Sequence, residues 1–117
     1  DFIYVTDLCD ALYELILRDD IKNEIFNLGS GNPISVNQVA ELVGGEKVYI
    51  PKRPGEPEII HADFSKIVSK IDWKPKISIT DGVQRLISNI SYWKRAPVWD
   101  PDKIAKETKL WFKYLND

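Results

Sequence analysis

Three short segments near the start of the chain are rich in β-branched and aromatic side chains. They cover residues 2–6, 24–28 and 47–50, and each one predicts a β-strand. Between them, apolar residues recur at helical spacing in residues 8–16 and 36–43, which predicts two amphipathic helices. Strands that alternate with helices favour an α/β fold, with a parallel sheet joined by right-handed crossovers.

Polar residues and glycines at the predicted helix ends support these boundaries. Asp7 is expected to cap the first helix at its N-terminus. Ser35, followed three residues later by Gln38, forms a capping-box pattern for the second helix. Gly44 and Gly45 are expected to end that helix, because glycine readily adopts the left-handed conformation just beyond a helix.

The second half of the chain predicts a loop followed by three helices. Residues 51–60 are rich in proline and predict an irregular loop. Asp63, Ser78 and Asp100 are favoured N-caps, and Pro101 occupies a favoured first helical position. The faces expected to be buried comprise Val36, Val39, Ala40 and Val43; Phe64, Ile67, Val68 and Ile71; Val83, Leu86, Ile87, Ile90 and Trp93; and Ile104, Thr108, Trp111 and Leu115, with Trp99 and Phe112 packing between helices.

The overall composition is that of an ordinary globular protein and argues against several classes of function. Hydrophobic residues make up 44% and charged residues 29% of the 117 positions. The formal charge of −2 argues against general nucleic-acid binding, which usually requires an excess of basic residues. No apolar run approaches the roughly 20 residues that span a bilayer, and the first residues do not resemble a signal peptide.

Cysteine, histidine and methionine content leads to three further expectations. The single cysteine, Cys9, fits a reducing cytoplasm and is expected to be a buried small residue rather than a nucleophile. Cys9 and the single histidine, His61, cannot build a Cys/His zinc site. The sequence contains no methionine and opens on a strand pattern, so we expect the chain to be part of a longer protein. Open edges on a three-stranded sheet would point the same way.

Several patterns have both a functional and a structural explanation. Residues 29–34 begin like a dinucleotide fingerprint, but Ile34 replaces the third glycine, so a plain glycine-rich turn is favoured over phosphate binding. His61 is expected to make backbone hydrogen bonds from a loop, with a role as a catalytic base as the alternative. The acids at positions 19, 20 and 58 are expected to be solvated, although paired acids also occur in metal and proton-transfer sites.

One short segment predicts ligand binding. Arg53, Pro54, Gly55 and Glu56 place a guanidinium in a Pro/Gly turn, beside a carboxylate. A guanidinium donates two parallel N–H bonds to phosphate oxygens, which an ammonium group cannot do. Glu56 offers an acceptor for ribose hydroxyl groups. The segment therefore favours a nucleotide diphosphate as ligand, whereas a lone arginine in a loop is more often an ordinary surface residue.

Three segments, taken in order, match the pattern of a known enzyme family. Residues 1–8 begin with Asp1 and Phe2, residues 26–36 contain an Asn-Leu-Gly-x-Gly turn, and residues 53–75 run from Arg-Pro-Gly through Ala-Asp-x-Ser-Lys to Trp-Lys-Pro. Over at least residues 1–90, the chain resembles the carboxyl-terminal part of the extended short-chain dehydrogenase/reductases. The resemblance is to their NAD-dependent nucleotide-sugar epimerases and dehydratases, similar to UDP-glucose 4-epimerase and dTDP-glucose 4,6-dehydratase.

The resemblance implies a fold, a ligand and roles for three residues. The fold would be the carboxyl-terminal portion of a Rossmann-type parallel sheet, with its last β-α-β-α-β elements in residues 1–50. A substrate-binding loop and a small helical cap would follow in residues 51–117. Arg53 would contact the diphosphate of a UDP- or dTDP-sugar, Glu56 would contact the nucleotide ribose, and Phe2 would lie near the nucleotide.

The same resemblance places the chemistry outside these 117 residues. The family binds NAD through a Gly-x-x-Gly-x-x-Gly loop and moves protons with a Tyr-x-x-x-Lys pair, and neither motif occurs here. We therefore expect no catalytic, cofactor-binding or metal-binding residue in this chain, and no turnover by the chain alone. NAD would be bound mainly by residues outside it, in a cytoplasmic homodimer without nucleic-acid or membrane partners. The alternative is a stand-alone, non-catalytic nucleotide-binding or protein-interaction module.

Overall fold

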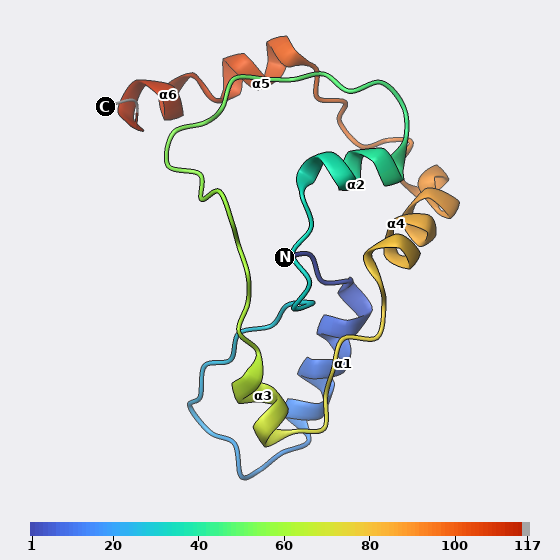
Figure 1. Cartoon of the computed structure of the whole chain (residues 1–117), viewed down its shortest axis with the longest axis vertical. Coiled ribbons are helices and arrows are strands. Elements are labelled where there is room, and N and C mark those ends of the chain that lie inside the picture. The colour runs from blue at the N-terminus through green and yellow to red at the C-terminus, as the bar shows by residue number, and fades with distance from the viewer. Residues whose placement is uncertain (116–117) are drawn as a thin grey trace.

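The computed structural model describes residues 1–115, and every regular element within this range is helical. In chain order the elements are α1 (Val5–Ile16), α2 (Val36–Val43), α3 (Ser65–Lys70), α4 (Ile79–Ser88), the 3-10 helix η1 (Ile90–Trp93), α5 (Pro101–Glu107) and α6 (Lys109–Leu115). Figure 1 shows α1 and α3 at one end of an elongated molecule, α2 and α4 near the middle, and α5 and α6 at the other end. The long connection from α2 to α3 runs past α5 and α6.

The predicted α/β fold was wrong, because residues 1–115 contain no strand and therefore no Rossmann-type parallel sheet. Residues 24–28 and 47–50 are irregular, and α1 begins inside the first predicted strand, at Val5. β-branched and aromatic side chains fit a pleated sheet surface, but they do not by themselves stabilise a strand. A strand also needs a neighbour for its ladder of hydrogen bonds, and the described residues form no such pair.

The helix boundaries follow the local capping signals more closely. The Ser35 hydroxyl accepts a hydrogen bond from the Gln38 N–H at 3.1 Å, and the Gln38 side chain accepts from the Ser35 N–H at 3.0 Å, so the predicted capping box is confirmed. Gly44 follows α2 with a φ of 79°, in the left-handed region that favours glycine. Ser78 and Asp100 cap α4 and α5, as predicted.

Two predicted caps are displaced from the helix ends. Asp7 was expected to be the N-cap of the first helix, but α1 already begins after Tyr4 and Asp7 lies in its first turn. α3 begins at Ser65, so Asp63 precedes the N-cap position by one residue. The Asp63 carboxylate still accepts a hydrogen bond from the Ser65 backbone N–H, at 2.9 Å. Its function at the helix start is therefore retained although its position is shifted.

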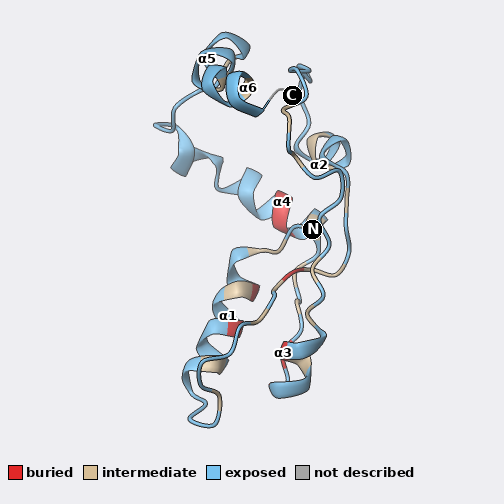
Figure 2. Ribbon diagram, turned by 90° about the vertical axis from the view of Figure 1, so that its left-hand side faces the viewer, coloured by how far each residue is buried: buried red, intermediate tan, exposed pale blue. Residues whose placement is uncertain are grey.

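A small core lies between α1 and α3. Ala11 of α1 and Ile67 of α3 have no exposed area, and Ile71 and Trp73, which follow α3, are almost as deeply buried. The ring of Phe64 meets that of Trp73 edge-on, with 6.1 Å between ring centroids. Figure 2 shows buried residues in α1, in α3, at the start of α4 and in the segment before it, whereas α5 and α6 are mostly exposed.

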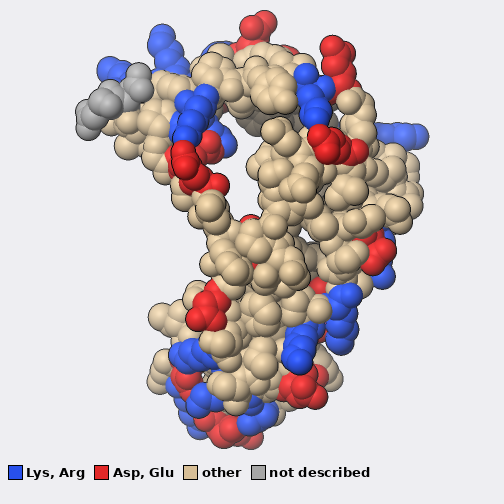
Figure 3. All heavy atoms as spheres, viewed as in Figure 1, with Lys and Arg blue, Asp and Glu red and all other residues tan. Residues whose placement is uncertain are grey.

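Many apolar residues that were predicted to be buried are exposed. They include Leu12 and Ile16 of α1, Val36 and Val43 of α2, Leu86, Ile87, Ile90 and Trp93 in α4 and η1, and Trp99, Trp111 and Leu115 further along. Cys9 is also exposed, contrary to expectation. An amphipathic pattern indicates that a helix face needs a cover, but it does not say which element supplies that cover. Figure 3 shows charged side chains mainly towards the two ends of the viewed face, with a largely uncharged region between them.

Asp7 joins two distant parts of the chain. It is 2% exposed, and its carboxylate accepts hydrogen bonds from the backbone N–H groups of Lys76 and Ile77, at 3.0 and 2.9 Å. Its backbone carbonyl accepts another from the indole N–H of Trp73, at 3.0 Å. These bonds hold the segment before α4 against α1. Breaking them would leave a buried carboxylate without hydrogen-bond partners, which is costly in free energy.

Candidate functional site

The predicted ligand-binding segment forms a tight turn, which we call the arginine turn (residues 52–58). Gly55 has a φ of 76°, a left-handed value that allows the chain to reverse there. The Arg53 guanidinium forms an ion pair with the carboxylate of Glu56, and both side chains are a little more than one-third exposed, at 37% and 38%. The structure thus brings the two sequence-predicted ligands together, and it leaves both within reach of solvent.

Arg53 also lies against α6. Its guanidinium carbon is 5.3 Å from the centroid of the Trp111 ring, within the range of a cation–π contact. The indole N–H of Trp111 donates a hydrogen bond of 2.8 Å to the carbonyl of Pro54, the residue after Arg53. One tryptophan therefore contacts both the side chain and the backbone of the arginine turn.

The arginine turn borders two cavities of similar size. The first, of about 330 Å³, is lined by Lys52, Arg53, Pro54, Gly55, Glu56 and Glu58. The second, of about 320 Å³, is mainly apolar and is lined by Tyr49, Ile50, Pro51, Arg53, Pro101, Ile104, Ala105, Thr108 and Phe112. Arg53 lines both cavities, so it connects a polar space on the turn with an apolar space against α5 and α6.

A second ion pair accompanies the first on the same turn. The Lys52 ammonium is 2.9 Å from the carboxylate of Glu58, and its hydrogen bond holds the pKa of Glu58 below the ordinary value. Glu58 was expected to be simply solvated, and it is indeed highly exposed, although it is paired. An anionic ligand at the turn would meet two cations, Lys52 and Arg53, each of which already contacts a carboxylate of the protein.

Phe2 lies in the opening segment and is 44% exposed. Its neighbour Asp1 lines a cavity of about 270 Å³ together with Glu58, which also borders the cavity of the arginine turn. Phe2 lines neither of the two cavities that Arg53 borders. The structure thus places the start of the chain next to the end of the arginine turn, without bringing Phe2 to the guanidinium.

The glycine-rich turn at residues 29–31 holds a carboxylate of its own chain. The Asp1 carboxylate accepts hydrogen bonds from the N–H groups of Ser30, Gly31 and Ala62 at 2.8, 3.2 and 3.1 Å, and from the Ser30 hydroxyl at 2.6 Å. A Cβ atom on Gly29 would lie 2.5 Å from the Cβ of Ala62, so only glycine fits this close approach. These N–H groups are therefore already engaged, which supports the plain-turn interpretation over phosphate binding.

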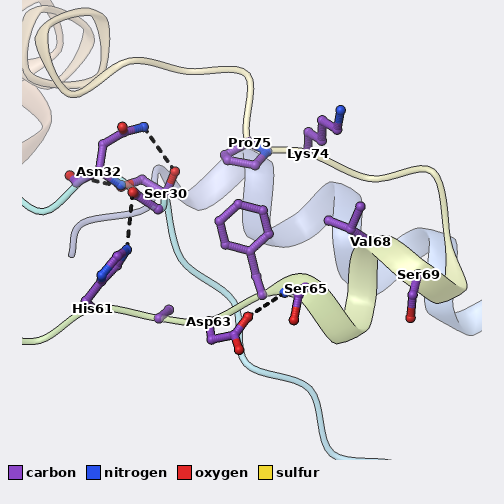
Figure 4. Close-up of a pocket in the computed structure, with 12 residues that line it drawn as sticks. Ser30, Asn32, His61, Asp63, Ser65, Val68, Ser69, Lys74 and Pro75 are labelled. Carbon is purple, nitrogen blue, oxygen red and sulfur yellow. Dashed lines mark hydrogen bonds between the residues drawn. The ribbon is translucent and has the colours of Figure 1, made fainter.

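A cavity of about 860 Å³, larger than those of the arginine turn, lies beside the glycine-rich turn and α3 (Figure 4). His61 Nε2 is 3.3 Å from the carbonyl oxygen of Gly31, which is the backbone contact expected of a structural histidine. Hydrogen bonds from Ser65 lower the pKa of Asp63. Lys74 extends away from the other polar groups. Most of the polar contacts drawn in Figure 4 join side chains that line the cavity to backbone groups that line it as well. Within residues 1–115, no cluster of His, Cys, Asp and Glu could hold a metal ion.

Two residues at the arginine turn were not singled out from the sequence. Lys52 directly precedes Arg53, so two adjacent basic residues before a Pro-Gly turn would have been a usable signal. Trp111 offered no local signal as a site residue, because it lies 57 positions beyond Pro54.

Comparison with known proteins identifies relatives. No family model matches the chain, and no solved structure matches it. The chain is 36% identical to a UDP-glucose 4-epimerase of Azospirillum brasilense, over 82% of this chain and 29% of the relative. It is 34% identical to a UDP-glucuronate 4-epimerase of Thermodesulfobacterium geofontis, over 75% of this chain and 29% of the relative. It is 30% identical to the UDP-glucuronic acid decarboxylase 1 of Arabidopsis thaliana, over 75% of this chain and 21% of the relative.

The chain belongs to the nucleotide-sugar epimerase/dehydratase family of extended short-chain dehydrogenase/reductases. It spans less than a third of the length of these relatives and matches their carboxyl-terminal part. This confirms the family predicted from the Asp1-Phe2, Asn-Leu-Gly and Arg-Pro-Gly segments. Within residues 1–115 of this family member, no helix is both long enough and apolar enough to cross a bilayer.

Proposed function

We propose that this chain binds the diphosphate of a UDP-sugar for an NAD-dependent enzyme of the epimerase family. The proposal depends above all on Arg53, which lines two cavities and whose guanidinium contacts both Glu56 and Trp111. The names of the relatives refer to UDP-glucose, UDP-glucuronate and UDP-glucuronic acid, which favours UDP over dTDP. Residues 51–117 would form the substrate-binding part of the protein.

The ion pair at the turn suggests how a diphosphate would enter. A phosphate oxygen competes with the Glu56 carboxylate for the same guanidinium N–H groups, and a diphosphate offers more negative charge and more acceptors. Once displaced, Glu56 would be free to accept hydrogen bonds from ribose hydroxyl groups. Lys52 would add a second positive charge when Glu58 releases it. The turn thus keeps its cations paired until a stronger anion arrives.

The sugar chemistry would come from other residues. The chain has neither the glycine loop that binds NAD in this family nor the Tyr-x-x-x-Lys pair, so the residues present do not fit NAD and we derive no catalytic step from them. Phe2 remains a candidate for contact with the nucleotide, from the opening segment. We propose that the intact enzyme acts as a homodimer on a nucleotide sugar.

The first prediction concerns Arg53 and is measured by calorimetric titration of the complete protein with UDP. Arg53→Ala should weaken binding by about 1.5–3 kcal/mol, the usual contribution of a hydrogen bond to a charged group. Arg53→Lys should recover only part of this loss, because lysine keeps the positive charge but not the two parallel N–H donors of the guanidinium. The matched control is Arg18→Ala, since Arg18 forms an exposed ion pair with Asp20 on another part of the chain.

A companion variant tests the exchange of partners in the same titrations. Glu56→Gln should tighten binding of pyrophosphate, because the competing carboxylate is removed. UDP should gain less than pyrophosphate, since glutamine offers the ribose only one, uncharged, acceptor oxygen in place of a carboxylate. If Arg53→Ala leaves the UDP affinity equal to that of the Arg18→Ala control, the diphosphate role of Arg53 is wrong.

A further inference from the structure

The contact between α6 and the arginine turn joins residues far apart in the sequence. Trp111 lies outside the three segments that carry the family resemblance, the last of which ends at residue 75, so the family pattern assigns it no role. In the structure its ring lies 5.3 Å from the Arg53 guanidinium carbon, and its N–H bonds to the Pro54 carbonyl at 2.8 Å. Trp111 is 40% exposed, so it forms part of the molecular surface at the site.

We propose that Trp111 is a positioning residue of the diphosphate site, and that it sets the orientation of Arg53 for two-point contact with phosphate. The inference rests on the proposed function of Arg53 and adds a residue to it. An arginine on a loop loses side-chain freedom when it binds, and prior orientation reduces that cost. Trp111 supplies this orientation through contacts that persist without ligand.

Two features of the geometry support the assignment. A ring packed against a guanidinium attracts its positive charge, whereas the N–H groups lie in the guanidinium plane and point outwards from its edge. The contact with Trp111 acts on the positive charge and is not a hydrogen bond from the guanidinium, so it restricts Arg53 and leaves its N–H donors for a diphosphate. The hydrogen bond to the Pro54 carbonyl fixes the backbone of the turn at the same time, so side chain and backbone are held by one residue.

Glu56 and Trp111 hold Arg53 in different ways. Glu56 is an ion-pair partner that occupies guanidinium donors, so a phosphate must displace it. Trp111 is uncharged and accepts no hydrogen bond from the guanidinium, so a phosphate does not compete with it. The structure thus separates an exchangeable partner from a permanent one at the same guanidinium.

The test compares two Trp111 variants in the complete protein, titrated calorimetrically with UDP, uridine and pyrophosphate. Trp111→Leu should weaken UDP and pyrophosphate binding about 5- to 20-fold, since it removes both the cation–π contact and the indole hydrogen bond. Uridine has no phosphate, so its affinity should not change. Trp111→Phe retains a ring and should lose less, which also provides a variant that disturbs folding least. Trp99→Leu, at another exposed tryptophan, is the matched control.

The outcomes separate this inference from the proposed function. Equal losses for UDP and uridine would show that Trp111 acts only on the general structure and would overturn the positioning role. Unchanged pyrophosphate binding by both Trp111 variants, in a protein where Arg53→Ala weakens it as predicted, would overturn this inference and leave the role of Arg53 standing. If Arg53→Ala also leaves UDP binding intact, the proposed function itself fails. Circular dichroism of each variant verifies that the helices are retained.

Discussion

At the scale of single residues, Asp7 carries the most demanding set of contacts. Its carboxylate is buried and serves two backbone N–H groups that lie 69 and 70 positions further along the chain. Trp73 adds a third bond, to the Asp7 carbonyl. One side chain thus fixes the approach to α4 and, with it, the start of the carboxyl-terminal half.

Asp7→Ala should destabilise the protein by about 2–5 kcal/mol, because the Lys76 and Ile77 N–H groups would be left without acceptors. Asp7→Asn keeps one acceptor oxygen and should cost less. Chemical denaturation midpoints of the complete protein measure the difference. Asp10→Ala is the matched control on the same helix, since Asp10 forms only an exposed ion pair with Lys76. Equal midpoints for Asp7→Ala and Asp10→Ala would contradict the bridging role of Asp7.

Asp7 also shows why the role of a residue is harder to predict than its importance. The sequence suggested an N-cap, because an aspartate before an apolar periodic segment is a common cap. The actual partners of the carboxylate are backbone N–H groups in another part of the chain, and no local sequence pattern predicts them. Asp1, which holds the N–H groups of Ser30, Gly31 and Ala62, is a similar case.

At the scale of elements, α5 illustrates a helix whose start is set by its own sequence. Asp100 accepts a hydrogen bond from the Lys103 N–H at 2.8 Å, and Pro101 begins the helix. The pKa of Asp100 is lowered, mainly by the hydrogen bond from the Lys103 backbone N–H and to a lesser extent by the hydrogen bond from the Lys103 side chain. A carboxylate that caps a helix must be charged to do so fully, so α5 is expected to depend on pH.

The sign of this dependence follows from the direction of the shift. Because the folded-state pKa of Asp100 is lowered, its contribution to stability is complete above the ordinary aspartate pKa of about 4. The contribution is lost as the pH falls through the lowered pKa. The Lys103 amide resonance should therefore shift in acid, as measured by NMR titration. In Asp100→Asn this shift should disappear while the helix stays capped, since asparagine caps without titrating. An identical titration in Asp100→Asn would assign the effect to another group.

Helices and strands differed in how well the sequence predicted them, for a physical reason. A cap acts within three residues, so Ser35, Ser78 and Asp100 were identified from local patterns. A strand forms only against another strand, and residues 24–28 and 47–50 have none within the described part of the chain. The same side-chain pattern is therefore compatible with extended, irregular backbone.

At the scale of the whole molecule, the chain is open. Its radius of gyration is 17.8 Å, against about 13 Å for a compact domain of this length. Its accessible surface is 9776 Å², whereas a folded protein of this mass exposes about 6,500 Å². The excess of roughly 3,000 Å² is comparable with the area that a permanent interface buries. Many of the exposed side chains are large and apolar.

We therefore expect the 117-residue chain, produced by itself, to associate at micromolar concentration or to bind a hydrophobic dye strongly. The reason is that burial of the exposed apolar faces on α1, α2 and α4 lowers the free energy of the system. Sedimentation velocity and dye fluorescence measure the two effects. A monodisperse monomer that melts cooperatively and binds no dye would instead favour the stand-alone module.

The sequence by itself determined the family, the helix ends capped by Ser35 and Asp100, and the turn that carries Arg53, because each of these depends on residues close together in the chain. Only the tertiary structure decided that Asp7 serves a segment 70 positions away and that Trp111 lies against the Arg53 guanidinium. It also decided that the strand-like segments pair with no other strand among residues 1–115. Such contacts depend on which distant segments meet when the chain folds, and no local pattern of side chains specifies that.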